Sequence, residues 1–219
     1  MQYSYLLFDL DGTLTDSKEG ILRCVQYALE ACKRPVPDIE KLMPFIGPPL
    51  SESFPKFCGM TESETNFAVQ KYRERFSTVG IFENRVYDGI PELLEKLKSD
   101  GKILAVATSK PEIYAKRILD HFNLSQYFNA IAGSSIDHSK ETKADMIRLA
   151  MKRLSLKQDD KKSVLMIGDR LHDIIGSKEC GIDCAGVKYG YAPEGELEKY
   201  GAEYILSDIH ELEKFLLSK

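Results

Sequence analysis

The sequence lacks any apolar run long enough to cross a membrane. No stretch approaches the roughly 20 apolar residues that a membrane-spanning helix needs. The opening segment MQYSYLLFDLDG is too short and too acidic for a signal peptide. Neither sign of charge dominates, because 30 lysines and arginines stand against 34 aspartates and glutamates, giving a formal net charge of −4. We therefore expect a cytoplasmic protein that binds neither a membrane nor a nucleic acid polymer.

Cysteine is scarce and is not arranged in pairs. The five cysteines are odd in number, and none forms a Cys-x-x-Cys motif. We expect them to be reduced and mostly buried, with a structural zinc site as a less favoured alternative. They are Cys24, Cys32, Cys58, Cys180 and Cys184.

The hydrophobic pattern divides the 219 residues into two parts. Residues 16–85 predict helices and no convincing strand. Apolar residues recur at helical spacing from 21 to 32, short helices surround a proline-rich loop over 38–60, and Thr61 with Glu64 resembles a capping box that opens a helix through Phe76. We expect this part to be a small helical domain of its own.

Beyond residue 86, strands and helices alternate along the chain. This alternation predicts a parallel sheet with helices on both faces, which the first strand should join. The fold class is therefore α/β, with a Rossmann-like three-layer core formed by residues 1–15 and 86–219 and an inserted helical domain over 16–85. Strands are expected at 5–8, 103–107, 130–132, 164–167, 184–187 and 204–206, and helices at 91–99, 111–122, 143–154, 172–180 and 208–217.

The first strand, Tyr5 to Phe8, runs directly into two carboxylates. Asp9 and Asp11 are two residues apart, so their side chains begin on the same side of an extended chain, and Gly12 permits a sharp turn. Buried carboxylates are costly unless a cation or a proton transfer uses them. A hairpin turn with exposed acids is the competing interpretation. A calcium-binding EF-hand loop fails on register, because its glycine position falls on Leu14.

Polar residues also follow the next three predicted strands. Thr108 and Ser109 end the second, Lys143 opens the helix after the third, and Asp169 and Asp173 follow the fourth. Each has an ordinary explanation, such as a helix cap, a solvated lysine or a turn. However, open parallel sheets bind ligands beyond the carboxyl ends of their strands. Carboxylates, a hydroxyl and a lysine at one such edge suit a divalent cation together with a phosphate.

These residues, in this order and spacing, resemble the motifs of the haloacid dehalogenase superfamily of phosphatases over nearly the whole chain. The motifs are Asp9-Leu10-Asp11-Gly12-Thr13, Thr108, Lys143 and Gly168-Asp169-x-x-x-Asp173. The helical insertion resembles the mobile cap of that superfamily. Two segments look like the phosphoglycolate phosphatase-like and 5′-nucleotidase-like branches, namely residues 45–50 and the Gly-Asp-Arg-x-His-Asp run.

The resemblance implies a role for each matched position. Asp9 is expected to be the nucleophile that forms an aspartyl-phosphate, and Asp11 the acid and base. Mg²⁺ is expected to be held by Asp9, the Asp11 carbonyl and Asp169, with Asp173 supporting the metal site. The transferring phosphoryl group is expected to contact Gly12, Thr13, Thr108, Ser109 and Lys143.

The expected function is a Mg²⁺-dependent phosphomonoester hydrolase acting on a small phosphorylated metabolite. Phosphoglycolate leads narrowly over a nucleoside 5′-monophosphate or a pyrophosphate, and a phosphomutase is a less favoured sibling. Dehalogenation is disfavoured, because the dehalogenases of this superfamily lack an equivalent of Asp11. The loop 46–50 is the candidate for a cap segment that reaches the site, unless it merely joins two helices. The rival from another class is an inactive phospho-ligand sensor or interaction module.

Overall fold

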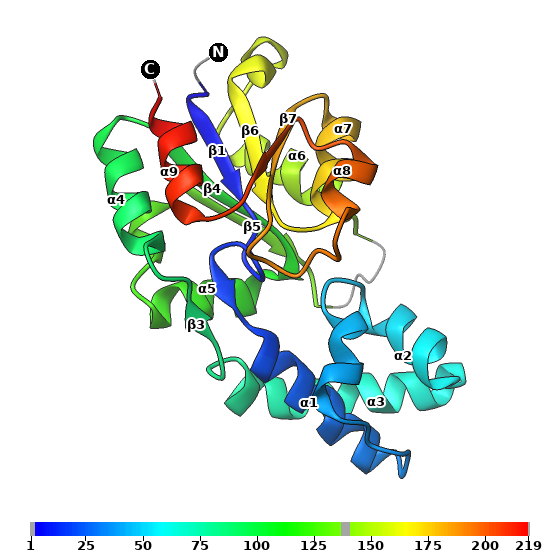
Figure 1. Ribbon diagram of the computed structural model, residues 1–219. Coiled ribbons are helices and arrows are strands. Elements are labelled where there is room, and N and C mark those ends of the chain that lie inside the picture. Colours follow the sequence, from blue (N-terminus) through cyan, green and yellow to red (C-terminus); the bar gives the residue numbers. More distant parts are fainter. Residues whose placement is uncertain (1–2, 137–140, 219) are drawn as a thin grey trace. The chain divides into compact units, whose positions relative to one another are not determined.

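The computed structural model describes residues 3–136 and 141–218. The chain divides into two compact units, one made of Met1–Thr15 with Val86–Lys219 and the other of Asp16–Arg85 (Figure 1). It passes between them at two short strands, β2 (Thr15–Asp16) and β3 (Arg85–Val86), which pair with each other. These strands reach into the part for which no strand was predicted. Two residues each are too few to produce a hydrophobic alternation in the sequence.

The larger unit is built on a six-stranded parallel sheet in the order β5-β4-β1-β6-β7-β8. Strand β1 is central, and its Tyr5 lies in register with Ile103 of β4 and Val164 of β6. The sheet confirms the predicted α/β class. Its strands are β1 (Tyr5–Phe8), β4 (Ile103–Pro111), β5 (Ala130–Ser134), β6 (Val164–Gly168), β7 (Asp183–Val187) and β8 (Tyr204–Leu206).

Helices cover both faces of this sheet, as the predicted three-layer arrangement requires. One face carries α4 (Ile90–Ser99), α5 (Glu112–His121) and α9 (Ile209–Leu217), together with the short η3 (Ser125–Tyr127) (Figure 1). The other face carries α6 (Lys143–Arg153), α7 (Leu171–Cys180) and α8 (Glu196–Tyr200). The segment η4 (Gln158–Ser163) leads into β6. Leu6, Leu7 and Phe8 of β1 are fully buried between the two layers.

The smaller unit is helical, with α1 (Lys18–Ala31), η1 (Ile39–Phe45), α2 (Leu50–Cys58), α3 (Glu62–Arg75) and η2 (Phe76–Gly80). The capping box is confirmed, because the Glu64 N–H donates to Thr61 Oγ1 at 3.3 Å and the Thr61 N–H donates to Glu64 Oε2 at 2.9 Å. Helix α3 thus begins as the sequence predicts. Buried Phe54 and Phe45 pack edge to face, with ring centroids 5.2 Å apart.

Strand β4 differs from its prediction at its carboxyl end. It was expected to stop at Ala107, but it continues to Pro111, with a shift in register against β5 between Thr108 and Pro111. Helix α5 begins only at Glu112. Thr108 and Ser109 therefore belong to an irregular strand end and do not cap the helix, contrary to the expectation that they stand directly before its first turn.

The cysteines and the helix lengths bear on two further expectations. All five cysteines are free thiols, and three of them, Cys24, Cys180 and Cys184, are buried. Within the residues described, the metal-binding group that the structure offers consists of aspartates alone. None of the described helices is long and apolar enough to pass through a membrane.

Candidate active site

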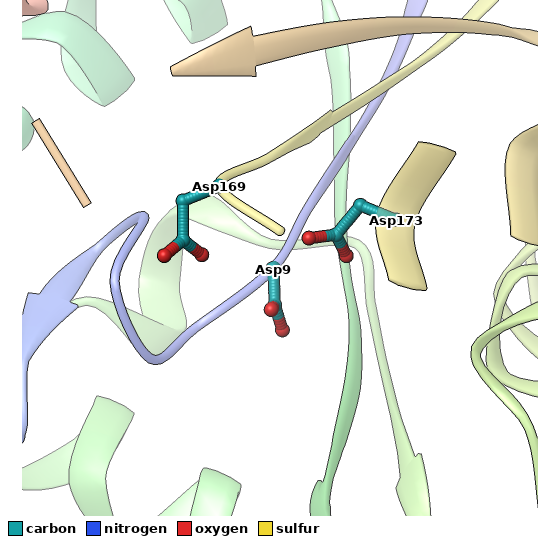
Figure 2. Close-up of side chains that lie close together, drawn as sticks. All are labelled: Asp9, Asp169 and Asp173. Carbon is teal, nitrogen blue, oxygen red and sulfur yellow. The ribbon is translucent and has the colours of Figure 1, made fainter. Parts of the chain in front are cut away.

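Three aspartates meet at the carboxyl end of the sheet. Asp9 follows β1, Asp169 follows β6 and Asp173 lies in the first turn of α7, and one carboxylate oxygen from each lies within 4.8 Å of the others (Figure 2). The pairing of β1 with β6 brings the first two together, because the Asp9 N–H donates to the Ile167 carbonyl at 2.9 Å. The sequence predicted this meeting from the strand ends alone.

Lys143 is inserted between two of these carboxylates. Its Nζ lies 2.8 Å from Asp9 Oδ1 and 2.8 Å from Asp173 Oδ1, and it donates to the Ala107 carbonyl at 3.2 Å. The side chain is only 4% exposed. A capping box at Thr142 fixes the start of α6 and therefore the position from which Lys143 extends. This lysine is a buried partner of the acids and not a solvated surface residue.

Asp169 is fully buried and accepts two hydrogen bonds. Its Oδ2 accepts a hydrogen bond from the Tyr191 N–H at 2.7 Å, and its Oδ1 accepts one from Thr13 Oγ1 at 3.3 Å. Two glycines make room for it. A Cβ on Gly12 would lie 2.2 Å from Asp169 Oδ2, and a Cβ on Gly190 would lie 2.3 Å from Asp169 Cβ. Gly12 also has φ +85°, a conformation that favours glycine.

Gly190 and Tyr191 were not predicted as site residues. They follow β7, a strand to which the rule of strand ends had not been applied. The same loop carries Tyr189, whose hydroxyl donates to the Thr13 carbonyl at 3.0 Å and whose ring packs on Tyr87 at 5.0 Å between centroids. A Lys-Tyr-Gly-Tyr run directly after a predicted strand was the signal that could have identified this loop.

Burial governs the electrostatics of the cluster. It raises the pKa of Asp9 to about 6, against the opposing charge of Lys143 and with a further upward push from Asp173. The pKa of Asp169 is raised well above its ordinary value, first by burial and then by Asp173 and Asp9. Burial alone would lower the pKa of Lys143, but its ion pairs with Asp173 and Asp9 prevail and raise it. Two of the three carboxylates, Asp9 and Asp173, thus share one buried ammonium.

This donor set suits a divalent cation. Asp9 Oδ1 and Asp173 Oδ1 are buried, and among the described residues the partner that the structure gives each of them is the Lys143 ammonium at 2.8 Å. Clustered carboxylate oxygens with excess negative charge are the ligands that Mg²⁺ prefers. A bound cation would also favour the ionised forms that burial disfavours.

Asp11 lies outside this cluster and has a lysine of its own. Its Oδ2 lies 2.5 Å from Nζ of Lys110, whose side chain is buried at the end of β4. Sequence analysis did not single out Lys110, although it directly follows Thr108 and Ser109. Thr108 is buried and its Oγ1 accepts from the Lys110 N–H at 3.2 Å, whereas Ser109 is exposed and its carbonyl accepts from Ser134 Oγ at 2.9 Å.

The chain is similar to several known proteins over most of its length. A 5′-nucleotidase of Pseudomonas aeruginosa is 44% identical over 100% of this chain and 97% of its own length. The tyrosine-protein kinase PtkA of Mycobacterium tuberculosis is 40% identical over 89% of this chain, which spans 65% of that protein. The crystal structure of a predicted phosphatase from Clostridium acetobutylicum has 47% identity, a TM-score of 0.92 and 99% coverage of both chains. Residues 6–187 match the family model itself, and the chain belongs to the haloacid dehalogenase-like hydrolase family.

Proposed function

We propose that this haloacid dehalogenase-like phosphatase is a Mg²⁺-dependent phosphomonoesterase that works through an aspartyl-phosphate. The observation that carries the proposal is the gathering of Asp9, Asp169 and Asp173 at the carboxyl end of the sheet, where buried Lys143 is paired with Asp9 and Asp173. Family membership supports the reaction type, and the donor set supports the metal.

In the proposed reaction, a carboxylate oxygen of Asp9 attacks phosphorus and the bond from phosphorus to the ester oxygen breaks. Asp11 gives its proton to the departing oxygen, which leaves as an alcohol. Asp11 then takes a proton from water as that water attacks the aspartyl-phosphate, which releases phosphate and restores Asp9. A carboxylate nucleophile thereby divides one difficult hydrolysis into two steps.

The chain's own residues would hold the cation and the phosphoryl group. Asp9, Asp169 and the Asp11 carbonyl would bind Mg²⁺, which when bound neutralises the phosphoryl oxygens. Lys143 would bring a second positive charge to the same oxygens. Asp173 is proposed as a supporting residue, because its Oδ1 faces Lys143 and its Oδ2 accepts from the Arg170 N–H at 3.1 Å. Thr108, Ser109, Gly12 and Thr13 are proposed phosphoryl contacts.

The energetics favour such a charge-rich site. Enzymes accelerate phosphomonoester hydrolysis by up to ~10²¹-fold, which corresponds to roughly 29 kcal/mol. General acid–base catalysis typically supplies ~10²–10⁴-fold of an acceleration. Most of the remainder has to come from positioning and from neutralising the charge on the phosphoryl oxygens, which is what positive groups at one sheet edge can do.

For the substrate, we place a nucleoside 5′-monophosphate ahead of phosphoglycolate, reversing the order favoured by the sequence motifs. The 44% identical relative over the whole chain is named a 5′-nucleotidase, which supports this order. One relative is named a tyrosine-protein kinase, so a second candidate reaction is transfer of the phosphoryl group to a tyrosine instead of to water. A panel of phosphorylated metabolites with Mg²⁺, scored for both free phosphate and phosphotransfer to tyrosine peptides, separates these possibilities.

The helical unit over residues 16–85 is proposed to be the cap domain of this enzyme. Its loop 46–50 combines Gly47, at φ +108°, with Pro48 and Pro49, so its backbone is restricted. If this loop selects the leaving group, the variant Pro48→Gly will raise KM for the preferred metabolite more than for p-nitrophenyl phosphate. Equal changes for both would contradict a role in selection.

The central test is hydrolysis of p-nitrophenyl phosphate by the wild-type protein with Mg²⁺, with and without a chelator. We expect activity that the chelator abolishes and that Asp9→Asn removes. Asp159→Asn is the matched control, because it makes the same chemical change at an exposed residue of η4. Turnover retained by Asp9→Asn would refute the assigned nucleophile. Turnover that survives the chelator would refute the metal dependence.

A further inference from the structure

Lys110 and Asp11 form a second ion pair that the proposed roles leave unexplained. Lys110 lies at the end of β4, its side chain is only 6% exposed, and its Nζ lies 2.5 Å from Asp11 Oδ2. The other oxygen, Asp11 Oδ1, is buried and accepts no hydrogen bond from the residues that the structure describes. One oxygen of Asp11 is therefore fixed by a cation, and the second has no hydrogen-bond partner among the described residues.

We infer that Lys110 is a positioning residue that holds Asp11 by Oδ2, so that Oδ1 can exchange the proton with the ester oxygen and later with water. The inference rests on the proposed function, in which Asp11 is the acid and base. It adds a residue to which neither the sequence motifs nor the family resemblance gave a role.

The ion pair has a chemical consequence as well as a geometric one. When Asp11 gives its proton to the departing oxygen, a negative charge forms on its carboxylate. The ammonium of Lys110 already lies beside that carboxylate, so the charge forms next to a positive partner in a buried site, where such a contact is stronger than in water. Lys110 should therefore matter most for esters whose leaving oxygen needs a proton.

The test compares two esters of similar size, p-nitrophenyl phosphate and benzyl phosphate. p-Nitrophenolate is a stable anion, whereas the benzyl alkoxide has to be protonated as it departs. The measured quantity is kcat/KM, because it reports the first half-reaction and excludes the hydrolysis of the aspartyl-phosphate, which is common to both esters. In Lys110→Met, we expect kcat/KM to fall about 100-fold for benzyl phosphate and less than about tenfold for p-nitrophenyl phosphate. Lys110→Arg keeps the cation and should restore the wild-type ratio in part.

Lys102→Met is the matched control. Lys102 is also buried, directly precedes the same strand at its other end, and donates to the Tyr3 carbonyl at 2.9 Å. Its loss should lower thermal stability without changing the ratio of the two kcat/KM values. Thermal unfolding of each variant shows that the rates belong to folded protein, and Lys110→Arg provides the same comparison where Lys110→Met does not fold.

The outcomes separate this inference from the function on which it rests. Equal losses for both esters, or an unchanged ratio in both Lys110 variants, would overturn the positioning role while leaving the phosphatase intact. A wild-type protein that hydrolyses neither ester with Mg²⁺ would overturn the proposed function and this inference with it.

Discussion

Replacing Lys143 by methionine should destabilise the larger unit in a pH-dependent way. The substitution roughly preserves the shape of the side chain and removes the one ammonium that lies 2.8 Å from both Asp9 Oδ1 and Asp173 Oδ1. Removing one partner of a buried ion pair typically costs about 3–5 kcal/mol, because a buried charge is left uncompensated. We expect a loss of that size at pH 7 in the absence of Mg²⁺.

Acidification should relieve part of this loss. Burial already raises the pKa of Asp9 to about 6 in the presence of Lys143. Without the lysine, the carboxylates can become neutral by taking up a proton, and each pH unit changes the free energy of that uptake by about 1.4 kcal/mol. Wild type itself gains about 1.4 kcal/mol between pH 7 and pH 5, because its Asp9 takes up a proton near pH 6. The variant gains about 2.7 kcal/mol from a carboxylate that is protonated throughout this range, so the difference in unfolding free energy between wild type and Lys143→Met should shrink by roughly 1.3 kcal/mol.

The assay is urea unfolding followed by circular dichroism, because the chain has no tryptophan. Lys102→Met serves as the control, since it removes a buried ammonium that donates to the Tyr3 carbonyl and lies 3.6 Å from one partly exposed carboxylate, Asp100. Its destabilisation should be nearly the same at both pH values. A Lys143→Met protein that loses less than about 1 kcal/mol at pH 7, or the same amount at pH 5, would refute the reasoning.

Three further changes test other contacts. Gly190→Ala should cost about 1–3 kcal/mol and weaken Mg²⁺ activation, because its Cβ would lie 2.3 Å from Asp169 Cβ; an unchanged Mg²⁺ titration would contradict this. The variant Asp9→Asn, studied without Mg²⁺, removes the buried negative charge of the Asp9 carboxylate. The Asp9 pKa is raised from 3.8 to about 6, so the stability that wild type holds below pH 4 is lost as pH rises through 6. The variant should therefore gain about 2.4 kcal/mol relative to wild type between pH 4 and pH 7 in urea unfolding. Thr61→Ala should cost the helical unit about 1 kcal/mol by loss of the α3 cap, without altering turnover of p-nitrophenyl phosphate.

The sequence predicted the fold well where the local hydrophobic pattern of a segment agrees with the place of that segment in the folded protein. Strand β1 is found at Tyr5–Phe8, as predicted, because a central strand buried on both faces reads as a continuous apolar run. The predicted end of β4 was wrong because the local pattern and the tertiary role disagree there. Thr108, Ser109 and Lys110 are polar and predict a loop, whereas pairing with β5 keeps the backbone extended through the shift in register.

In the site, too, some contacts could be predicted from local sequence and others could not. Asp9 and Asp169 could be placed together because parallel strands deliver their carboxyl ends to one edge. The sequence could not identify Lys110 as the partner of Asp11, since Lys110 is 99 residues away along the chain and is one of many lysines. Gly190 was missed because its importance lies in the absence of a side chain beside Asp169, and a glycine after a strand is otherwise an ordinary turn residue.

The two aspartates that open the site are two residues apart, yet the structure gives them different partners. Asp9 faces Lys143 and the other acids, in the surroundings of a cation-assisted nucleophile. Asp11 faces Lys110 and is separated from the acid cluster, in the surroundings of a group that exchanges protons. Asp9 meets buried Lys143 at the start of α6, whereas Asp11, just before the turn at Gly12, meets buried Lys110 at the end of β4. We propose that the division of labour between nucleophile and acid–base group depends on which lysine each carboxylate meets, and exchanging either lysine for a neutral residue should impair one proposed role and spare the other.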